Sequence, residues 1–294
     1  MQTKLLLIGS NGQVGRELVP CLQPLGELVI VNRDVCDLTN ASQIQNVIRS
    51  EKPQFVINAS AYTQVDLAED EKDLCMQVNA EAPAVMAKEC HEIGATLIHY
   101  STDYVFNGNN DQPWTETDLT DPKNVYGESK LKGEEGIASS GCNYLILRTS
   151  WVYGLHGKNF LLTMLRLAES KESLNVVDDQ IGAPTWSRMI AMNTGLVLND
   201  LIRTQKEVKE TIHFAAAGKT SWCGFTKEII RIASKKNELV LNNPDLVNPI
   251  PSEAYPQKAY RPKYSVMSTD KLKETFNIQM PEWKEQLKAC LSFL

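Results

Sequence analysis

Tyr126 and Lys130 stand four residues apart in the run Tyr-Gly-Glu-Ser-Lys. If this run is helical, the two side chains lie on one face, one turn apart. An isolated tyrosine is a poor acid–base catalyst because its pKa is about 10, whereas a nearby ammonium favours the phenolate and lowers that pKa. A tyrosine tuned in this way can exchange a proton with a carbonyl or alcohol oxygen. The spacing alone is also typical of an ordinary surface pair, so the interpretation needs support from the rest of the chain.

Thr102 is the third polar residue with a chemical use. It follows the apolar run that starts at residue 96, and it is expected at the carboxyl end of a strand. Ligands of open α/β sheets bind beyond these strand ends. The Thr102 hydroxyl could therefore hydrogen-bond a substrate carbonyl or oxyanion, and Thr102, Tyr126 and Lys130 form the predicted catalytic set.

The first half of the chain alternates short apolar runs with longer amphipathic stretches. Strands are expected at 4–8, 28–31, 55–58, 96–100 and 144–148, and helices at 13–23, 40–51, 73–93 and 125–140. This rhythm predicts an α/β fold with a Rossmann-like, doubly wound parallel sheet. Pro20 should kink the first helix or end it early, and Gly26 is a plausible stop.

After residue 150 the pattern becomes irregular, with prolines and glycines gathered at 182–184 and 244–262. Helices are still expected at 159–170, 186–203, 222–236 and 282–293. We predict a dinucleotide-binding domain over 1–150, with segments at about 185–215 returning to it. Residues 151–294 should mainly form a smaller, loop-rich substrate-binding lobe.

Gly9, Gly12 and Gly15 follow the first strand and open the first helix. This is the context of a dinucleotide-binding loop, although the spacing is Gly-x-x-Gly-x-x-Gly. Gly9 permits the turn, Gly12 lets the backbone approach a pyrophosphate, and Gly15 allows close helix–strand packing. A glycine-rich turn without a ligand is the alternative. The predicted cofactor contacts in this loop are Gly9, Asn11, Gly12, Gln13, Val14 and Gly15.

The end of the second strand bears on the choice of cofactor. Arg33 is placed to pair with a 2′-phosphate, which favours NADPH, whereas Asp34 and Asp37 keep NADH possible. Arg33 could equally be a solvated surface charge. Small residues after the third strand would let the cofactor lie close. The predicted contacts beyond the loop are Arg33, Asp37, Leu38, Ala59, Ser60, Ala61, Tyr62, Tyr126 and Lys130.

Composition limits the remaining classes. The 294 residues carry a formal net charge of −6, without the basic footprint of a nucleic-acid-binding protein. No apolar run approaches the roughly 20 residues of a membrane span. Seven scattered cysteines indicate a reduced, cytoplasmic protein, and no histidine or cysteine spacing indicates a metal site. A homodimer is a reasonable expectation because two-fold dimers are the commonest homo-oligomers.

Motifs along the whole chain together resemble the dTDP-4-dehydrorhamnose reductases, a family of extended short-chain dehydrogenases/reductases. The most specific is Asp-Gln-x-Gly-x-Pro-Thr at 179–185, which most related reductases and epimerases lack. The others are the glycine loop, 58–61, Ser-Thr-Asp-Tyr-Val-Phe at 101–106, Tyr126 with Lys130, 148–154, 159–160, 255–256 and 261–262.

The resemblance implies reduction of the C4 ketone of dTDP-4-dehydro-β-L-rhamnose to dTDP-β-L-rhamnose, the last step of dTDP-L-rhamnose synthesis. Tyr126 would give a proton to the C4 oxygen, while Lys130 would lower the Tyr126 pKa and hold the nicotinamide ribose. Thr102 would orient the carbonyl.

By position, Asp103 and Trp151 would contact the sugar and Arg261 would meet the diphosphate. Each has a structural alternative. Asp103 could be a cap or turn residue, Trp151 a core aromatic, and Arg261 one partner of a surface salt bridge.

The motifs argue against a dehydratase and leave two other functions open, an epimerase and a regulatory subunit. Related 4,6-dehydratases carry an Asp-Glu pair after the threonine, and Tyr104 cannot supply that carboxylate. A nucleotide-sugar epimerase uses the same three catalytic residues and would recycle a tightly bound cofactor. The regulatory subunit of methionine adenosyltransferase also resembles these reductases, but this chain keeps all three residues that a working reductase requires.

Overall fold

The computed structural model describes residues 2–235 and 239–294. Its centre is a parallel sheet of six strands in the order β10-β5-β4-β3-β1-β2. The strands are β1 (Lys4–Ile8), β2 (Glu27–Val31), β3 (Phe55–Asn58), β4 (Thr96–Thr102), β5 (Asn143–Thr149) and β10 (Lys209–His213). The expected Rossmann-like parallel sheet is confirmed. Because the chain leaves β1 in one direction for β2 and then returns to its other side for β3, the carboxyl ends of β1 and β3 form a topological switch point.

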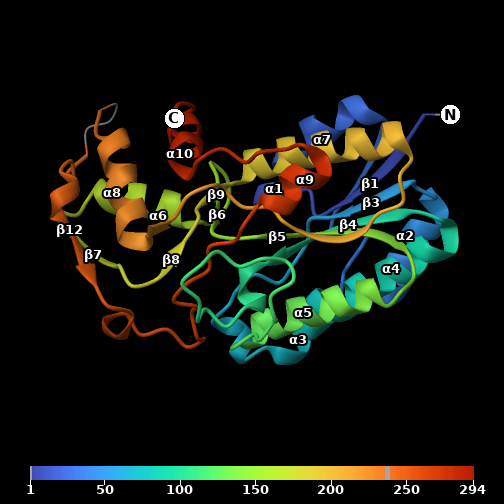
Figure 1. The fold of residues 1–294 in the computed structure, drawn as a ribbon, viewed down its shortest axis with the longest axis horizontal. Helices are drawn as coiled ribbons and strands as arrows, with labels where there is room; N and C mark the ends of the chain where they lie inside the picture. The colour runs from blue at the N-terminus through green and yellow to red at the C-terminus, as the bar shows by residue number, and fades with distance from the viewer. Residues whose placement is uncertain (1, 236–238) are drawn as a thin grey trace.

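Helices cover both faces of this sheet, as Figure 1 shows. Alternate residues of β1 point to opposite faces. Leu5 and Leu7 pack in the core that also contains residues of α1 (Gln13–Leu22) and α7 (Ser187–Thr204). Leu6 and Ile8 pack in a second core with residues of α2 (Ala41–Glu51) and α4 (Ala82–Ile93). The sheet is therefore buried on both sides, and its functional groups emerge only at the strand ends.

Helix α1 does not end early at Pro20. It continues to Leu22, and a 3-10 turn follows before Gly26. Pro20 is exposed, whereas Leu18 and Leu22 are fully buried, so packing on α7 holds the helix together across the proline. The expected helix at 73–93 is interrupted by a π-helical turn at Gln77–Glu81, between α3 (Lys72–Met76) and α4.

A second lobe lies beside the sheet, at the left of Figure 1. It is built around Tyr153, Trp186 and Phe225, all buried. Its helices are α6 (Phe160–Ala168), α8 (Trp222–Ala233) and α10 (Trp283–Leu291), and its strand pairs are β6 (Val152–Tyr153) with β9 (Thr185–Trp186), β7 (Leu174–Val177) with β12 (Val247–Ile250), and β8 (Ile181–Gly182) with β11 (Thr220–Ser221). The helix expected at 222–236 thus ends at Ala233, and residue 236 lies outside the described residues. A domain boundary near residue 150 stays a prediction.

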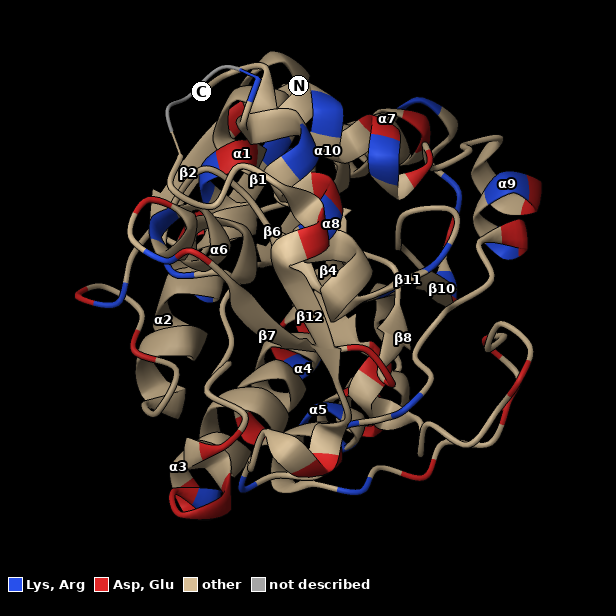
Figure 2. Cartoon of the chain, turned by 90° about the vertical axis from the view of Figure 1, so that its left-hand side faces the viewer, with Lys and Arg blue, Asp and Glu red and all other residues tan. Residues whose placement is uncertain are grey.

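Helix α5 (Val125–Ala138) also packs on the sheet. The remaining elements are α9 (Asp270–Phe276) and the 3-10 turns at Gln23–Leu25, Leu67–Glu69, Asp103–Val105, Pro244–Leu246 and Ser252–Ala254. Acidic and basic residues share the outer turns of α7, α8 and α9 (Figure 2). Among the described residues, no helix combines the length and apolarity needed to cross a membrane.

A buried ion pair fastens α5 to β5. Nε and Nη2 of Arg148 donate to the Glu134 carboxylate at 2.9 and 2.6 Å, and both side chains are only 6% exposed. Glu134→Leu keeps a similar volume but leaves the guanidinium buried without its partner. We expect a loss of about 3–5 kcal/mol of unfolding free energy, measured by urea denaturation.

The matched control is Glu128→Gln on the same helix. Glu128 pairs with Lys132 at 2.7 Å, but both side chains are half exposed. That variant should unfold with nearly the wild-type free energy. Equal stability of the two variants would show that the buried pair does not hold the helix.

Candidate active site and cofactor pocket

The N-terminus of α5 places Tyr126 and Lys130. Asn124 caps the helix, because its Oδ1 accepts from the Gly127 N–H at 2.7 Å. A Cβ on Gly127 would lie 2.3 Å from the Tyr104 carbonyl oxygen, so this glycine allows α5 to touch the segment after β4. The Tyr126 ring consequently meets the Tyr104 ring edge-on, with centroids 5.4 Å apart.

Lys130 is buried and turns back onto β4. Its Nζ donates to the Tyr100 carbonyl oxygen at 2.6 Å and lies 3.1 Å from His99 Nε2. Burial lowers the Lys130 pKa to about 8, against smaller opposing effects of Glu134 and Cys75. The lysine is thus held at the sheet edge by a backbone carbonyl.

The expected effect of Lys130 on Tyr126 is wrong for this structure. Burial raises the Tyr126 pKa above its ordinary value, a hydrogen bond with Thr102 acts in the opposite direction, and Asp103 adds to the rise. The spacing shows only that a lysine charge is near, whereas the removal of the phenolate from water has the larger effect on the Tyr126 pKa. Tyr126 therefore stays protonated at neutral pH.

Thr102 and Asp103 lie beside Tyr126. Thr102 Oγ1 donates to Asp103 Oδ1 at 3.0 Å and accepts from the Tyr104 N–H at 3.2 Å, so Thr102, rather than Asp103, is the cap of the turn. Burial raises the Asp103 pKa to about 6. Asp103 Oδ2 is buried without a hydrogen-bond partner among the described residues. The pair thus presents one unsatisfied acceptor near the phenol.

The first cavity, of about 310 Å³, lies over the switch point. Seven predicted cofactor residues line it: Gly9, Arg33, Asp37, Leu38, Ser60, Ala61 and Tyr62. The sequence analysis missed several others, including Asn32, Cys36, Gln64 and Glu71. Of these, Glu71 accepts from the Tyr62 hydroxyl at 2.8 Å.

The other predicted cofactor residues lie outside this lining: Asn11, Gly12, Gln13, Val14, Gly15, Ala59, Tyr126 and Lys130. Val14 packs against the core, and Gln13 Oε1 accepts from Asn159 Nδ2 at 2.9 Å.

The three glycines of the loop differ in the space that a Cβ would have. Gly9 has φ +91°, and a Cβ there would lie 2.2 Å from Ser60 Oγ. A Cβ on Gly15 would lie 2.0 Å from the Gly9 carbonyl oxygen. Gly12 is different, since its nearest neighbour would be 3.5 Å away, an ordinary contact. Packing within the chain explains Gly9 and Gly15, whereas it does not require a glycine at position 12.

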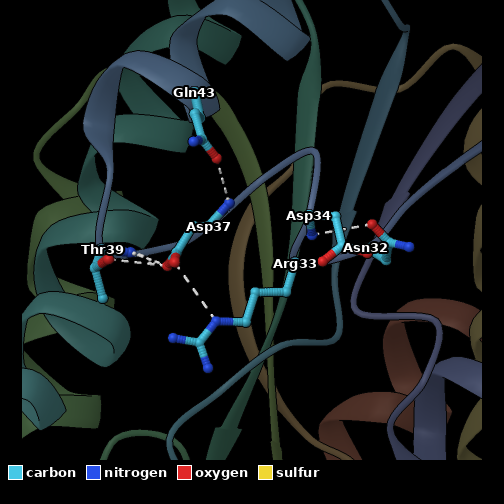
Figure 3. A network of polar contacts seen from close by, with 6 residues as sticks. All are labelled: Asn32, Arg33, Asp34, Asp37, Thr39 and Gln43. Atoms are coloured by element: carbon cyan, nitrogen blue, oxygen red, sulfur yellow. Dashed lines mark hydrogen bonds and ion pairs between the residues drawn. The ribbon is translucent and has the colours of Figure 1, made fainter.

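Arg33 is held at the rim of this cavity (Figure 3). Its Nε lies 3.5 Å from Asp37 Oδ2, and its side chain is 81% exposed. The other carboxylate oxygen of Asp37, Oδ1, accepts hydrogen bonds from the N–H and the hydroxyl of Thr39. These bonds lower the Asp37 pKa. Neither terminal nitrogen of Arg33 bonds a described residue, so both can reach an anion.

A second cavity, of about 410 Å³, is lined in part by Tyr104, whose ring meets that of Tyr126. It is lined by Tyr104, Phe160, Met164, Gln180, Trp222 and Arg261, among others. Arg261 Nη2 donates to Asp66 Oδ2 at 2.8 Å, while its Nη1 is buried without a partner among the described residues. The Arg261 side chain is 13% exposed and that of Asp66 is 47% exposed, so only the guanidinium of this ion pair is shielded from water.

Trp151 is partly buried and does not line the second cavity itself. It adopts φ +47° and stacks on Trp222, with centroids 3.5 Å apart and planes 3° apart. Trp222 Nε1 donates to Gln180 Oε1 at 3.2 Å. Trp151 thus reaches the cavity through Trp222, a residue that the sequence analysis did not select as a site residue.

Two buried polar side chains also escaped the sequence analysis. Asn79, in the π-helical turn, accepts from the Tyr62 N–H at 2.9 Å and donates to Ser129 Oγ at 3.1 Å. Asn79 therefore links Tyr62, which lines the first cavity, to Ser129 on α5. His99 lies within the apolar strand β4, where no motif marks it. Among the described residues, no group of three His, Cys, Asp or Glu side chains could hold a metal ion.

Comparisons with known proteins bear on the whole chain. The family model described as RmlD substrate binding domain matches residues 3–294. A dTDP-4-dehydrorhamnose reductase of Burkholderia thailandensis is 42% identical, over 98% of both chains, and one of Escherichia coli K12 is 41% identical, over 99% of this chain and 97% of its own.

Solved structures agree with these relatives. The crystal structure of a Bacillus anthracis dTDP-4-dehydrorhamnose reductase in complex with NADP has a TM-score of 0.90 at 35% identity and covers 100% of both chains. A Thermotoga maritima UDP-glucose 4-epimerase with UDP-glucose has a TM-score of 0.80 at 17% identity, over 99% of this chain and 98% of its own, and shares the fold.

Gly182→Ala tests how Trp151 is held. A Cβ at Gly182 would lie 2.4 Å from Cε2 of Trp151, so the indole must leave its stack on Trp222. We expect the near-ultraviolet circular dichroism of the stacked indoles to disappear, with a loss of about 1–3 kcal/mol of stability. Gly195→Ala in α7 is the control, because its Cβ would make ordinary contacts from 3.4 Å. An unchanged Gly182→Ala spectrum would refute this packing.

Proposed function

The chain belongs to the RmlD substrate binding domain family, and we propose from this premise that it is an NAD(P)H-dependent dTDP-4-dehydrorhamnose reductase. It reduces the C4 ketone of dTDP-4-dehydro-β-L-rhamnose to dTDP-β-L-rhamnose, the last step of dTDP-L-rhamnose synthesis. The resemblance drawn from the motifs is confirmed by full-length relatives about 40% identical to the chain.

One observation carries the proposal: Tyr126 lines neither cavity itself but contacts residues that line each of them. It packs against a cluster that contains Tyr62, which lines the first cavity. Its ring also meets Tyr104, which lines the second cavity. A proton donor in contact with the walls of a cofactor pocket and a substrate pocket is the arrangement that a carbonyl reductase requires.

NADPH is the proposed cofactor, with NADH as a weaker substitute. The B. anthracis relative was solved with NADP. The residues of the first cavity fit this group, since Gly9 brings the backbone of the glycine loop to its wall and Arg33 has two uncommitted nitrogens. When bound, the nicotinamide supplies the hydride that C4 receives.

The side chains divide the remaining work. Tyr126, protonated at neutral pH, donates its proton to the C4 oxygen as negative charge develops there. Thr102 positions that oxygen with its hydroxyl, after exchanging its bond to Asp103 for one to substrate. Lys130, fixed on the Tyr100 carbonyl, holds the nicotinamide ribose.

Substrate contacts are proposed for three further residues. Asp103 has a buried, unpartnered Oδ2 that can accept from a sugar hydroxyl. Arg261 has a free, buried Nη1 that can meet the diphosphate. Trp151, clamped by Trp222, supports the sugar.

Two alternatives are separable by experiment. The epimerase likeness at 17% identity extends to the fold alone. An absorbance assay of NAD(P)H with a panel of 4-keto nucleotide sugars decides between the functions. Net ketone-dependent oxidation supports the reductase, whereas stoichiometric bound NAD without net oxidation indicates an epimerase. No oxidation together with tight binding to another enzyme would indicate a regulatory subunit.

A cytoplasmic location, a homodimer and a separate domain over 1–150 complete the proposal. The seven cysteines are all free, which fits a reducing compartment. The dimer is supported only by the prevalence of two-fold homo-oligomers.

Tyr126→Phe removes the proposed proton donor with little change of volume. We expect kcat to fall by about 10²–10⁴-fold while the Kd of NADPH stays within error. Tyr144→Phe on β5, away from both cavities, serves as the control. A Tyr126→Phe enzyme with wild-type kcat would show that another group supplies the proton.

Arg33→Ala removes the proposed partner of the 2′-phosphate. The Kd of NADPH should rise about tenfold or more, because a charge-assisted hydrogen bond is lost, while the Kd of NADH stays constant. Arg203→Ala, which breaks an exposed pair with Asp200 on α7, should change neither value. Equal weakening of both cofactors would contradict the assignment of Arg33.

A further inference from the structure

The segment that carries Arg261 is held by side chains from two distant parts of the chain. Residues 253–258, which precede it, are all exposed. Ala259, by contrast, is 3% exposed, and its N–H donates to Asp66 Oδ1 at 3.0 Å. The other carboxylate oxygen of Asp66 accepts from Arg261 Nη2 at 2.8 Å. Asp66 therefore fixes both the backbone and the guanidinium of this segment.

Asn124 supplies the second anchor. Its Nδ2 donates to the Tyr260 carbonyl oxygen at 2.8 Å, and its Oδ1 accepts from the Gly127 N–H at 2.7 Å. These partners settle the orientation of the amide, because a backbone N–H can only donate and a carbonyl oxygen can only accept. Asn124 is buried. One side chain thus caps α5 and joins its first turn to the segment that carries Arg261.

Glu69 closes a triangle of hydrogen bonds. Its Oε1 accepts from the Val125 N–H at 2.9 Å, so the segment 66–69 is also tied to the start of α5. The segments at 66–69, 124–125 and 259–261 are therefore joined in pairs, and we call them the anchor triangle. A closed set of bonds fixes the relative positions of its members more firmly than one bond does.

Two other contacts of the same segment are exposed and contribute less. Lys258 pairs with Asp70, and both side chains are more than half exposed. The Tyr260 hydroxyl donates to the Asn107 carbonyl oxygen at 3.1 Å, and Tyr260 is itself exposed. The bonds of Asp66 and Asn124 are thus the main polar anchors of residues 259–261.

The anchor triangle contains both Arg261 and Val125, the residue next to Tyr126. The Tyr126 ring meets the Tyr104 ring with centroids 5.4 Å apart. The Arg261 guanidinium carbon lies 5.9 Å from the centroid of the same Tyr104 ring. The phenol and the guanidinium are therefore neighbours of one aromatic ring, and the triangle sets the distance between them.

Helix capping alone does not call for an asparagine at position 124. Asparagine, aspartate and serine are about equally good caps, because each offers an oxygen that accepts from a backbone N–H. Only the asparagine amide adds a separate donor at the end of the same side chain. Aspartate has no donor, and serine has a single oxygen, one bond nearer the backbone. The donor is what the Tyr260 carbonyl uses.

We propose that Asn124 is a positioning residue that sets the distance between Tyr126 and Arg261, and so aligns the C4 ketone with its proton donor once the diphosphate is bound. The inference rests on the proposed function, which makes Tyr126 the acid and Arg261 the diphosphate contact. Binding energy at the diphosphate, remote from the reacting carbon, is then used to orient the ketone.

Asn124→Ser separates the two tasks of this side chain. The serine hydroxyl still caps α5, but its shorter reach leaves the Tyr260 carbonyl without a donor. We expect kcat for the 4-keto nucleotide sugar to fall about tenfold, because the substrate then lies out of register with Tyr126. The Kd values of thymidine diphosphate and NADPH, measured by calorimetry, should stay within error, since Asp66 still holds Arg261.

Asn40→Ser is the matched control. Asn40 caps α2 by accepting from the Gln43 N–H at 3.2 Å, and within the described part of the chain it bonds no residue of the anchor triangle. It should change none of these values. Weaker binding of both ligands by Asn124→Ser would indicate a general structural defect and would overturn the positioning role.

Hydrogen exchange of the full-length protein, followed by NMR, tests the anchor without turnover. In Asn124→Ser the Ala259 N–H should exchange about tenfold faster, whereas the Gly127 N–H, still capped, should keep its protection. Unchanged exchange at Ala259 would overturn the proposal, and so would faster exchange with a wild-type kcat. If Asn124→Ser does not fold, Asn124→Asp takes its place, because it keeps the cap and lacks the donor.

Failure of the proposed function gives a different result. A wild-type protein that reduces no ketone would overturn that function and this inference with it, whatever the exchange rates. A wild-type protein that reduces the ketone, with Asn124→Ser at full kcat, would overturn the inference alone.

Discussion

The buried bond from Lys130 to the Tyr100 carbonyl is the constraint on which the site depends. It joins α5 to β4 at 2.6 Å, and the Lys130 side chain is buried. Asn124 fixes the start of the same helix, so the first two turns of α5 are tied at both ends. Tyr126 lies between these ties and must therefore project over Thr102. The catalytic geometry follows from how one helix is anchored to one strand.

Close approach of backbones sets the rest of the site. Gly9, Gly15 and Gly127 each lie where a Cβ would come within 2.3 Å of another residue. Gly9 brings the glycine loop close to the end of β3, Gly15 brings the start of α1 close to that loop, and Gly127 brings the start of α5 close to the segment after β4. Rigid backbone contacts of this kind hold the walls of the two cavities more firmly than side-chain packing alone would.

Local patterns in the sequence predicted the first five strands of the sheet and the glycine loop after β1, because each depends on residues near one another in the chain. The catalytic set stays a prediction. The contacts that the sequence did not predict have a common feature, which is that their partners are far apart in the chain. Asp66 and Arg261 are 195 residues apart, and the partners of His99 and Asn79 come from other strands and helices. Spacing carries no information about such partners. The pKa of Tyr126 was assigned the wrong direction because spacing shows a charge four residues away but not the loss of water.

Loss of water also explains the directions in which the pKa values of three titratable groups of the site are shifted. The pKa of Tyr126 is raised, that of Asp103 is raised to about 6, and that of Lys130 is lowered to about 8. Each shift favours the uncharged form, as burial requires. Hydride transfer places negative charge on the C4 oxygen, and in a dry site that charge is costly unless a proton arrives with it. A neutral phenol beside the ketone can deliver that proton, whereas a phenolate stabilised by a charged lysine could only remove one. The same burial that contradicts the expected tuning of Tyr126 therefore suits it to act as the acid in the reduction of the ketone.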